Sequence, residues 1–216
     1  VPYNEGLLIF GFAPQPGKIF EVYDRIAFGG VGHPADVERL RMNLLDMAHL
    51  EGFNRSAQDV TSARLLQFGI APALKQNFEE IQRAPYIIRM LLVELDREGD
   101  PNFFRMNYDG HWETFKNGTA IAGEEKVMDW LQKEIQKQPF ATYSLEQALQ
   151  QACKLWDESR KLDSDDETKK NIPETLQEAF DQWYLEGAVL TEKSARKAIY
   201  RPLSKDEIER LKSSAF

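Results

Sequence analysis

The chain contains 216 residues, with a formal net charge of -8 and a pI near 5.1. This length suits one compact domain, and a hydrophobic fraction of 42% is enough to build its core. The acidic balance, without a cluster of Lys and Arg, argues against nucleic-acid binding. No stretch approaches the roughly 20 consecutive apolar residues of a membrane helix, and the single cysteine, Cys153, excludes an internal disulfide. These features predict a soluble, cytoplasmic protein with no membrane or nucleic-acid partner.

Four extended segments precede the first predicted helix. They are short runs of apolar or β-favouring residues at 1–4, 7–12, 18–23 and 26–31. The first two flank Asn4-Glu5-Gly6, where glycine can take the backbone angles of a tight hairpin turn. The second and third are separated by the breaker sequence Ala13-Pro14-Gln15-Pro16-Gly17. The beginning of the chain is therefore predicted to form β-strands.

Two amphipathic helices follow these strands. Between residues 35 and 51, apolar residues recur at three- and four-residue steps, which predicts a helix ended by Gly52. A second helix is predicted to begin at Ser56, with Asp59 three residues on in a capping-box pattern, and to run to residue 81. Phe78 belongs to its apolar stripe, and Pro72 should kink it.

The second half of the chain repeats the order of strands and then helices. Residues 86–95 are so continuously apolar that they predict a strand covered on both faces. The further predicted elements are strands at 103–108 and 111–115, helices at 124–138 and 144–161, a strand at 180–190 and a C-terminal helix at 204–213. The acidic stretch within 161–175 has too little apolar surface to fold and predicts a solvated loop.

The order of these elements predicts the fold class. Runs of strands that alternate with pairs of helices indicate an α+β protein, because each sheet must bury one face against another layer. We expect a four-layer αββα sandwich, in which two mainly antiparallel sheets pack together and helix pairs flank them. Residues 1–216 are expected to form a single domain.

Motifs that would carry chemistry are weak in this sequence. Gly29-Gly30-Val31-Gly32 precedes a helix but lacks the full pattern of a phosphate-binding loop, so a close-packed turn is favoured. The three histidines are far apart and have no cysteine partners at zinc-ligand spacing. Cys153 lies beside the apolar stripe of its helix, where a buried, inert thiol is usual. The sequence therefore predicts no metal, no cofactor and no catalytic residue.

A longer stretch carries a family resemblance. Residues 18–32, which contain Lys18 and the triplet Tyr23-Asp24-Arg25, resemble bacterial proteasome alpha subunits. The similarity continues in register from about residue 3 to residue 123, through Glu51-Gly52-Phe53, Asp59-Val60-Thr61 and Tyr108-Asp109-Gly110. It implies the two-sheet sandwich of N-terminal-nucleophile hydrolases. It also implies a homo-oligomeric ring of seven-fold symmetry, a proteasome beta-type partner and an ATPase activator.

The resemblance also separates catalytic from non-catalytic subunits. A catalytic beta-type subunit has an N-terminal threonine, an acidic residue at the end of the second strand and a lysine at the start of the third. Lys18 matches that lysine, but the acidic position falls at or beside Phe12, and the Ser-Gly-Gly signature is replaced by residues 161–175. We therefore expect a non-catalytic alpha-type subunit that caps and gates a beta ring and has no peptidase activity alone.

Two points remain open in the sequence. In alpha rings the counterpart of Lys18 binds the C-terminal carboxylate of the activator, but Lys18 could also point into solvent or pair with Glu21. The alternative function is a divergent, active threonine peptidase whose nucleophile lies upstream of Val1. A repurposed small-molecule binder or hydrolase of the same superfamily is a third possibility.

Overall fold

A computed structural model describes residues 1–15, 17–80, 82, 84–162, 172–192 and 199–214. Its strands form two sheets, with the order β1-β2-β8-β9 in one and β3-β4-β5-β6-β7 in the other, and all pairings are antiparallel. The strands are β1 (Pro2–Tyr3), β2 (Gly6–Ala13), β3 (Ile19–Tyr23), β4 (Ile26–Gly32), β5 (Ile88–Leu95), β6 (Pro101–Met106), β7 (Trp112–Phe115), β8 (Tyr184–Leu190) and β9 (Tyr200–Pro202). The predicted α+β class with two antiparallel sheets is confirmed.

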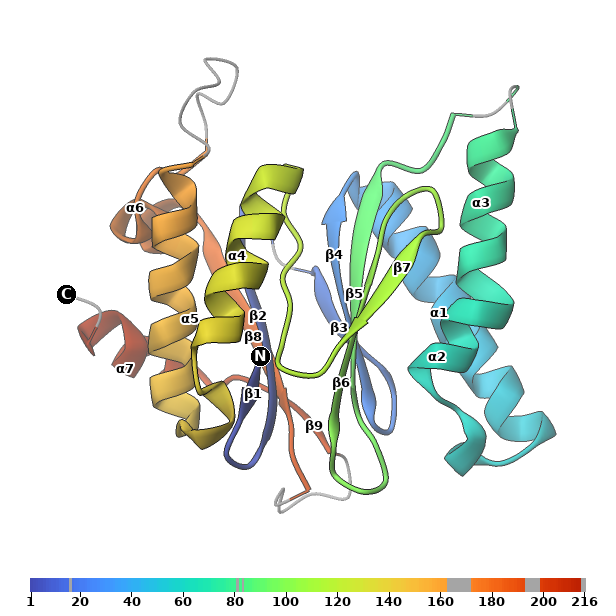
Figure 1. Ribbon diagram of the computed structural model, residues 1–216, viewed down its shortest axis with the longest axis horizontal. Coiled ribbons are helices and arrows are strands. Elements are labelled where there is room, and N and C mark those ends of the chain that lie inside the picture. The colour runs from blue at the N-terminus through green and yellow to red at the C-terminus, as the bar shows by residue number, and fades with distance from the viewer. Residues whose placement is uncertain (16, 81, 83, 163–171, 193–198, 215–216) are drawn as a thin grey trace.

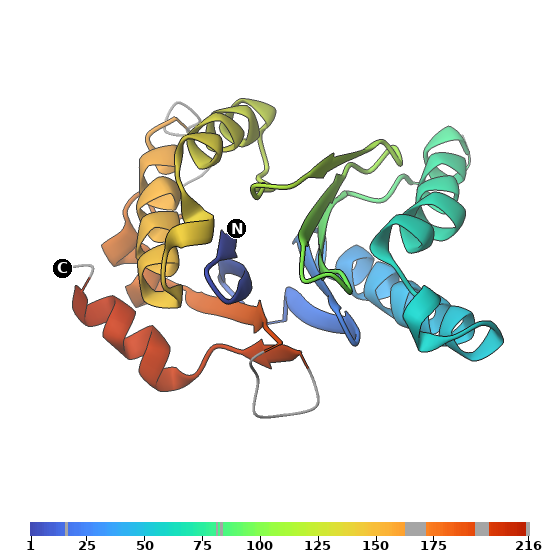
Figure 2. The same cartoon turned by 60° about the horizontal axis from the view of Figure 1, so that its bottom comes forward.

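The helices gather beside the outer faces of the sheets (Figure 1). They are α1 (Pro34–Asn54), α2 (Ser62–Leu65), α3 (Ala71–Glu79), α4 (Glu125–Lys137), α5 (Leu145–Arg160), α6 (Leu176–Gln182) and α7 (Lys205–Ser214). The first three lie along the five-stranded sheet, and the last four lie along the four-stranded sheet. The turned view in Figure 2 shows the same grouping, with the two sheets between the two sets of helices.

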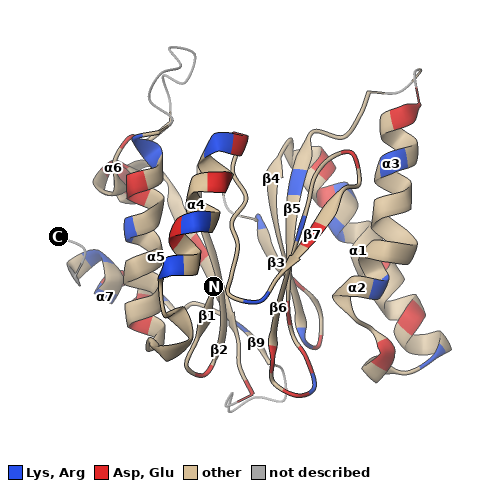
Figure 3. Cartoon of the chain, in the orientation of Figure 1, with Lys and Arg blue, Asp and Glu red and all other residues tan. Residues whose placement is uncertain are grey.

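Buried apolar side chains fill the spaces between these elements in separate clusters. Alternate residues of β5 point to opposite faces, so Met90 and Leu92 pack under α1–α3 while Leu91 and Val93 pack toward the other sheet. The cluster between the sheets consists of Leu7, Ile9, Ala27, Leu91, Val93, Leu95, Phe103, Ala188 and Leu190. The prediction that this strand is covered on both faces is confirmed. Figure 3 shows the charged residues mainly on helices and turns.

The second predicted helix differs from expectation at its start and in its middle. Ser56 does not cap a helix; its hydroxyl donates to Asp59 at 3.0 Å, beside a short 3-10 turn. The α-helix begins later, at Ser62, and the Thr61 hydroxyl accepts from the backbone N–H of Arg64 at 3.4 Å. A π-helical turn over Leu66–Ile70 then precedes Pro72. The wider turn accommodates a residue that cannot donate a helical hydrogen bond and whose ring crowds the preceding turn.

Two further boundaries were predicted wrongly. Helix α1 continues past Gly52 to Asn54, and Gly52 packs against the phenol of Tyr23, whose oxygen lies 2.3 Å from where a Cβ would stand. The expected strand at 180–190 begins only at Tyr184, because 176–182 form α6. Thr175 caps that helix, and Phe180, within the helix, turns its side chain into the core. Residues 163–171 of the predicted acidic loop lie outside the described residues.

The last helix is held by an ion pair and a capping box. The expected helix at 204–213 corresponds to α7, whose backbone N–H at Glu207 donates to the Ser204 hydroxyl at 3.2 Å. Glu207 in turn accepts from Ser204 N–H at 2.7 Å and from the two terminal guanidinium nitrogens of Arg201, Nη1 and Nη2, at 2.8 and 2.9 Å. Hydrogen bonds from Arg201 lower the pKa of Glu207 to about 2. The pair ties β9 to α7.

The glycine-rich segment ends β4 and starts α1. Gly29, Gly30 and Gly32 lie in β4, and His33 then caps α1 by accepting from Ala35 N–H at 3.3 Å. The expected turn is wrong for these glycines, which continue the strand, but their close packing against neighbouring residues is as expected. Gly32 has φ +150°, and a Cβ there would stand 2.1 Å from the carbonyl oxygen of Ile87. Only glycine fits this approach of two backbones.

Gly32→Ala should destabilise the fold by about 2 kcal/mol or more, because it adds backbone strain to a clash that no side-chain rotation can relieve. The measurement is the free energy of unfolding in urea. Gly11→Ala is the matched control, since no atom stands within 4 Å of its added Cβ. Equal stability of the two variants would contradict this explanation.

Glu207→Gln should reduce stability by about 1 kcal/mol at neutral pH, a value that allows for solvent screening of this partly exposed pair. The pKa of Glu207 is lower in the folded chain than its usual 4.5, so its stabilisation is complete above about pH 4.5. It is lost as the pH falls toward about 2. Thermal unfolding measured across this range should show a smaller acid dependence in Glu207→Gln than in the exposed control Glu209→Gln. The same acid dependence in both would argue against the pair.

Candidate functional site

Lys18 lies directly before β3, at the end of the loop that connects one sheet to the other. Its carbonyl oxygen accepts from Gly30 N–H of β4 at 3.1 Å. Its own backbone N–H donates to a carboxylate oxygen of Glu186 in β8 at 2.9 Å. The backbone of this lysine is therefore held from both sheets.

Glu186 is the residue that joins the sheets at this point. It pairs with Gly11 of β2 and extends from the four-stranded sheet, where its carboxylate accepts from the backbone N–H groups of Gly17 and Lys18. Gly17 has φ +99°, which turns two successive N–H groups toward one anion. The connection before β3 thus ends in a small anion-binding nest, and Glu186 fills it.

The side chains near this nest are acidic or phenolic. Burial, together with the charges of Glu21 and Glu186, raises the pKa of Tyr200 to about 12. Burial and the charge of Asp24 raise the pKa of Glu21. Within the described part of the chain, the Lys18 ammonium forms no salt bridge, with Glu21 or with any other carboxylate. The possible pairing of Lys18 with Glu21 is therefore not observed.

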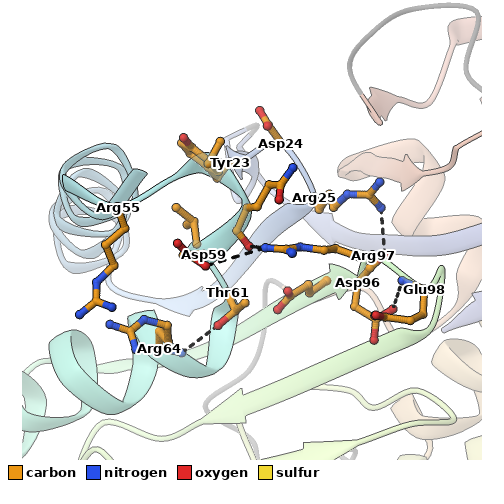
Figure 4. A pocket seen from close by; sticks show the side chains of 14 residues that line it. Tyr23, Asp24, Arg25, Arg55, Asp59, Thr61, Arg64, Asp96, Arg97 and Glu98 are labelled. Atoms are coloured by element: carbon orange, nitrogen blue, oxygen red, sulfur yellow. Dashed lines mark hydrogen bonds and ion pairs between the residues drawn. The ribbon is translucent and has the colours of Figure 1, made fainter. Parts of the chain in front are cut away.

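A separate pocket of about 680 Å³ lies at the opposite end of β3 (Figure 4). Its lining includes Tyr23-Asp24-Arg25 and Asp59-Val60-Thr61, two of the motifs that carry the resemblance. Arg97 extends across it from the turn between β5 and β6 and donates to the carbonyl of Gln58. The pocket therefore joins three segments that are distant in sequence.

The walls of this pocket carry both charges. Glu94 is only 7% exposed; burial raises the pKa of its carboxyl, and Ser62 N–H donates to it at 2.8 Å. At the other side, Arg55 and Arg64 both contact Glu51, at 3.0 and 2.7 Å. Because cations and carboxylates alternate around the pocket, its charge does not select one class of ligand.

The side chains that could ligate a metal or act as nucleophiles are dispersed. Among the described residues, no group of three or more His, Cys, Asp or Glu is arranged to hold a metal ion. His33 caps α1, and the His49 ring packs edge-on against Tyr23 with centroids 5.7 Å apart. Cys153 is buried, and burial raises its thiol pKa to about 12. No helix in the described ranges is long and apolar enough to cross a membrane.

Comparison with known proteins identifies the family. The family profile described as proteasome subunit matches residues 13–172, which is most of the chain. The chain belongs to the proteasome subunit family. The match extends past residue 123, where the resemblance in the sequence fades, and includes α4 and α5.

Several curated relatives are distant in sequence and carry the alpha name. "Proteasome subunit alpha" of Thermomonospora curvata is 30% identical over 135 residues, which cover 61% of this chain and 58% of that protein. The protein of the same name from Streptosporangium roseum is 33% identical over 131 residues, 58% of this chain and 49% of that one. The protein of the same name from Parafrankia sp. is 32% identical over 145 residues, which cover 65% of this chain and 59% of that protein. The matched segment thus spans about half of each relative.

The two strands expected from the resemblance to carry the acidic residue and the lysine of a catalytic subunit correspond to β2 and the start of β3. Phe12, at the position expected for the catalytic acid, packs outward against Trp156 and Phe180 with ring centroids 4.7 and 5.2 Å away. The carboxylate that does enter this region is Glu186, which the sequence reasoning missed. Its signal was the single acidic residue within the apolar run of β8, at a position that alternates with buried Ala188 and Leu190.

Proposed function

We propose that this chain is a non-catalytic alpha-type subunit of a proteasome-like core protease, which caps and gates a proteolytic beta ring and docks an ATPase activator. The observation that supports this function best is the ammonium of Lys18, which has no carboxylate partner among the described residues and stands on a backbone fixed by both sheets. The alpha names of the relatives favour the same assignment. The cytoplasm is the compartment that this function implies.

The chemistry of docking follows from the lysine. An ammonium is a compact charge that meets a carboxylate through charge-assisted hydrogen bonds, which contribute about 1.5–3 kcal/mol each. Lys18 has no carboxylate partner among the described residues, so a C-terminal carboxylate would not have to displace one. We propose that this carboxylate is supplied by the activator.

Assembly into a seven-fold ring is supported by the outer surface of α1–α3. Apolar side chains are exposed there although nothing in the described chain covers them: Leu50 (61%), Phe53 (89%), Phe68 (67%) and Phe78 (48%). Phe78 was expected in the core but instead packs on Tyr108, with ring centroids 5.6 Å apart. Such exposed apolar residues are typical of interaction surfaces. We propose that neighbouring subunits cover this surface and that the full four-layer αββα sandwich is the building block.

Catalysis by this chain is not part of the proposal. No carboxylate of β2 stands at the acidic position, because the strand carries only apolar side chains and glycine there. The alternative, an active threonine peptidase with its nucleophile upstream of Val1, would hydrolyse fluorogenic peptides and be blocked by a threonine-directed covalent inhibitor. Peptide hydrolysis by the purified protein without a beta-type subunit would favour that alternative.

Lys18→Ala should leave the fold intact but weaken binding of the activator's C-terminus by about ten- to a hundredfold, at 1.4 kcal/mol per factor of ten. The ligand is a labelled peptide that copies the C-terminus of a proteasome-activating ATPase, and fluorescence anisotropy gives its Kd. Lys133→Ala, on the exposed face of α4, is the matched control. Equal affinity of the Lys18 variant and the parent would refute the docking role.

The full-length protein should self-associate at micromolar concentration, with a mass near that of a seven-subunit ring or a stack of such rings by light scattering. Phe68→Glu should shift it toward smaller species, because it places a charge in the proposed subunit contact. Tyr184→Glu, at another exposed aromatic residue in β8, should not change the mass. A monomeric parent protein would count strongly against a ring.

A further inference from the structure

We infer that Glu186 is a positioning residue for Lys18: it fixes the backbone of the lysine so that the ammonium remains available to an incoming carboxylate. This inference rests on the proposed docking function and adds a residue from the opposite sheet to it. Neither the family pattern nor the relatives' names assign a role to this position.

The first support is the direction of the side chain. Along β8, Leu185 and Val189 belong to the core under α4–α7, whereas Ala188 and Leu190 belong to the core between the sheets. By alternation, Glu186 points between the sheets, at the edge of this apolar layer. A carboxylate at such a place is costly unless hydrogen bonds satisfy it.

The second support is how the carboxylate is satisfied. It accepts from the backbone N–H groups of Gly17 and Lys18, one residue apart. Charge-assisted hydrogen bonds to backbone N–H groups are among the stronger ones in proteins. They fix the end of the connection between β2 and β3, whose sequence contains two prolines and a glycine. Without them, Lys18 would be held at its carbonyl alone, through Gly30.

The third support is what Glu186 does not contact. It forms no salt bridge with the Lys18 ammonium, although it binds the same residue's backbone. The carboxylate therefore uses its lone pairs on two main-chain donors and leaves the cation unneutralised. The arrangement separates the two tasks: Glu186 orders the residue, and the ammonium binds.

The experiment compares Glu186→Ala and Glu186→Gln with the parent protein by two measurements. Hydrogen exchange, followed by NMR or by mass spectrometry of overlapping peptides, should be roughly tenfold or more faster at the Gly17 and Lys18 amides in Glu186→Ala. Affinity for the activator-derived peptide with a free carboxylate should fall by about tenfold. Glu186→Gln retains one acceptor oxygen and should lie between the parent and the alanine variant in both measurements. The same peptide with an amidated C-terminus serves as the negative ligand.

The outcomes separate this inference from the docking function. If Lys18→Ala binds the peptide like the parent, docking at Lys18 fails, and the exchange data alone decide whether Glu186 anchors the loop. If Lys18→Ala loses binding but Glu186→Ala does not, the positioning role is overturned. Tighter binding by both Glu186 variants would also overturn it, because Glu186 would then compete with the ligand. A lower Tm with unchanged exchange at Gly17 and Lys18 would assign Glu186 to stability only.

Discussion

The apolar layer between the two sheets is the constraint on which the rest of the structure depends. Because β5 contributes alternate side chains to this layer and to the core under α1–α3, the stacking of the sheets and the seating of those helices are fixed together. The same stacking determines which part of β8 lies beside the start of β3. A register shift of one residue would turn Glu186 away from the loop before β3, and Ala188 and Leu190 would leave the core. The geometry around Lys18 is therefore a consequence of core packing.

Much of the fold could be predicted from hydrophobic periodicity. The apolar runs of the strands, the apolar stripe of α1 and the helix starts predicted at residues 144 and 204 are local signals, and the structure bears them out. The errors arose where distant contacts decide the outcome. Helix α1 passes through Gly52 because Tyr23 packs there, and α6 forms because Phe180 is buried against α5. A seven-residue helix is too short for a periodic pattern to be distinguished from a strand.

Only one of the two main residues of the candidate site could be predicted from the sequence. Lys18 could be found because it lies in a contiguous stretch that resembles a family. Glu186 stands out as the one acidic residue of its strand, but its contact with Lys18 could not be predicted, because the two residues are 168 positions apart and meet only through the packing of one sheet on the other. Short β9, whose Tyr200 lies near the same nest, was missed for a similar reason: its three residues carry no alternation of their own and are ordered by pairing with β8. Polar contacts across an interior follow from tertiary register, which a single sequence does not display.

The chain's single thiol can report on local unfolding of the protein. Cys153 is almost completely buried in the core between α5 and the four-stranded sheet, and its raised pKa keeps it protonated at neutral pH. The thiolate is the reactive form. The folded protein should therefore resist alkylating reagents and oxidation, because the sulfur is both inaccessible and protonated. Any labelling must then pass through a state in which α5 has separated from the sheet. The rate at which a thiol reagent modifies the protein therefore measures the stability of this half of the molecule without an added probe.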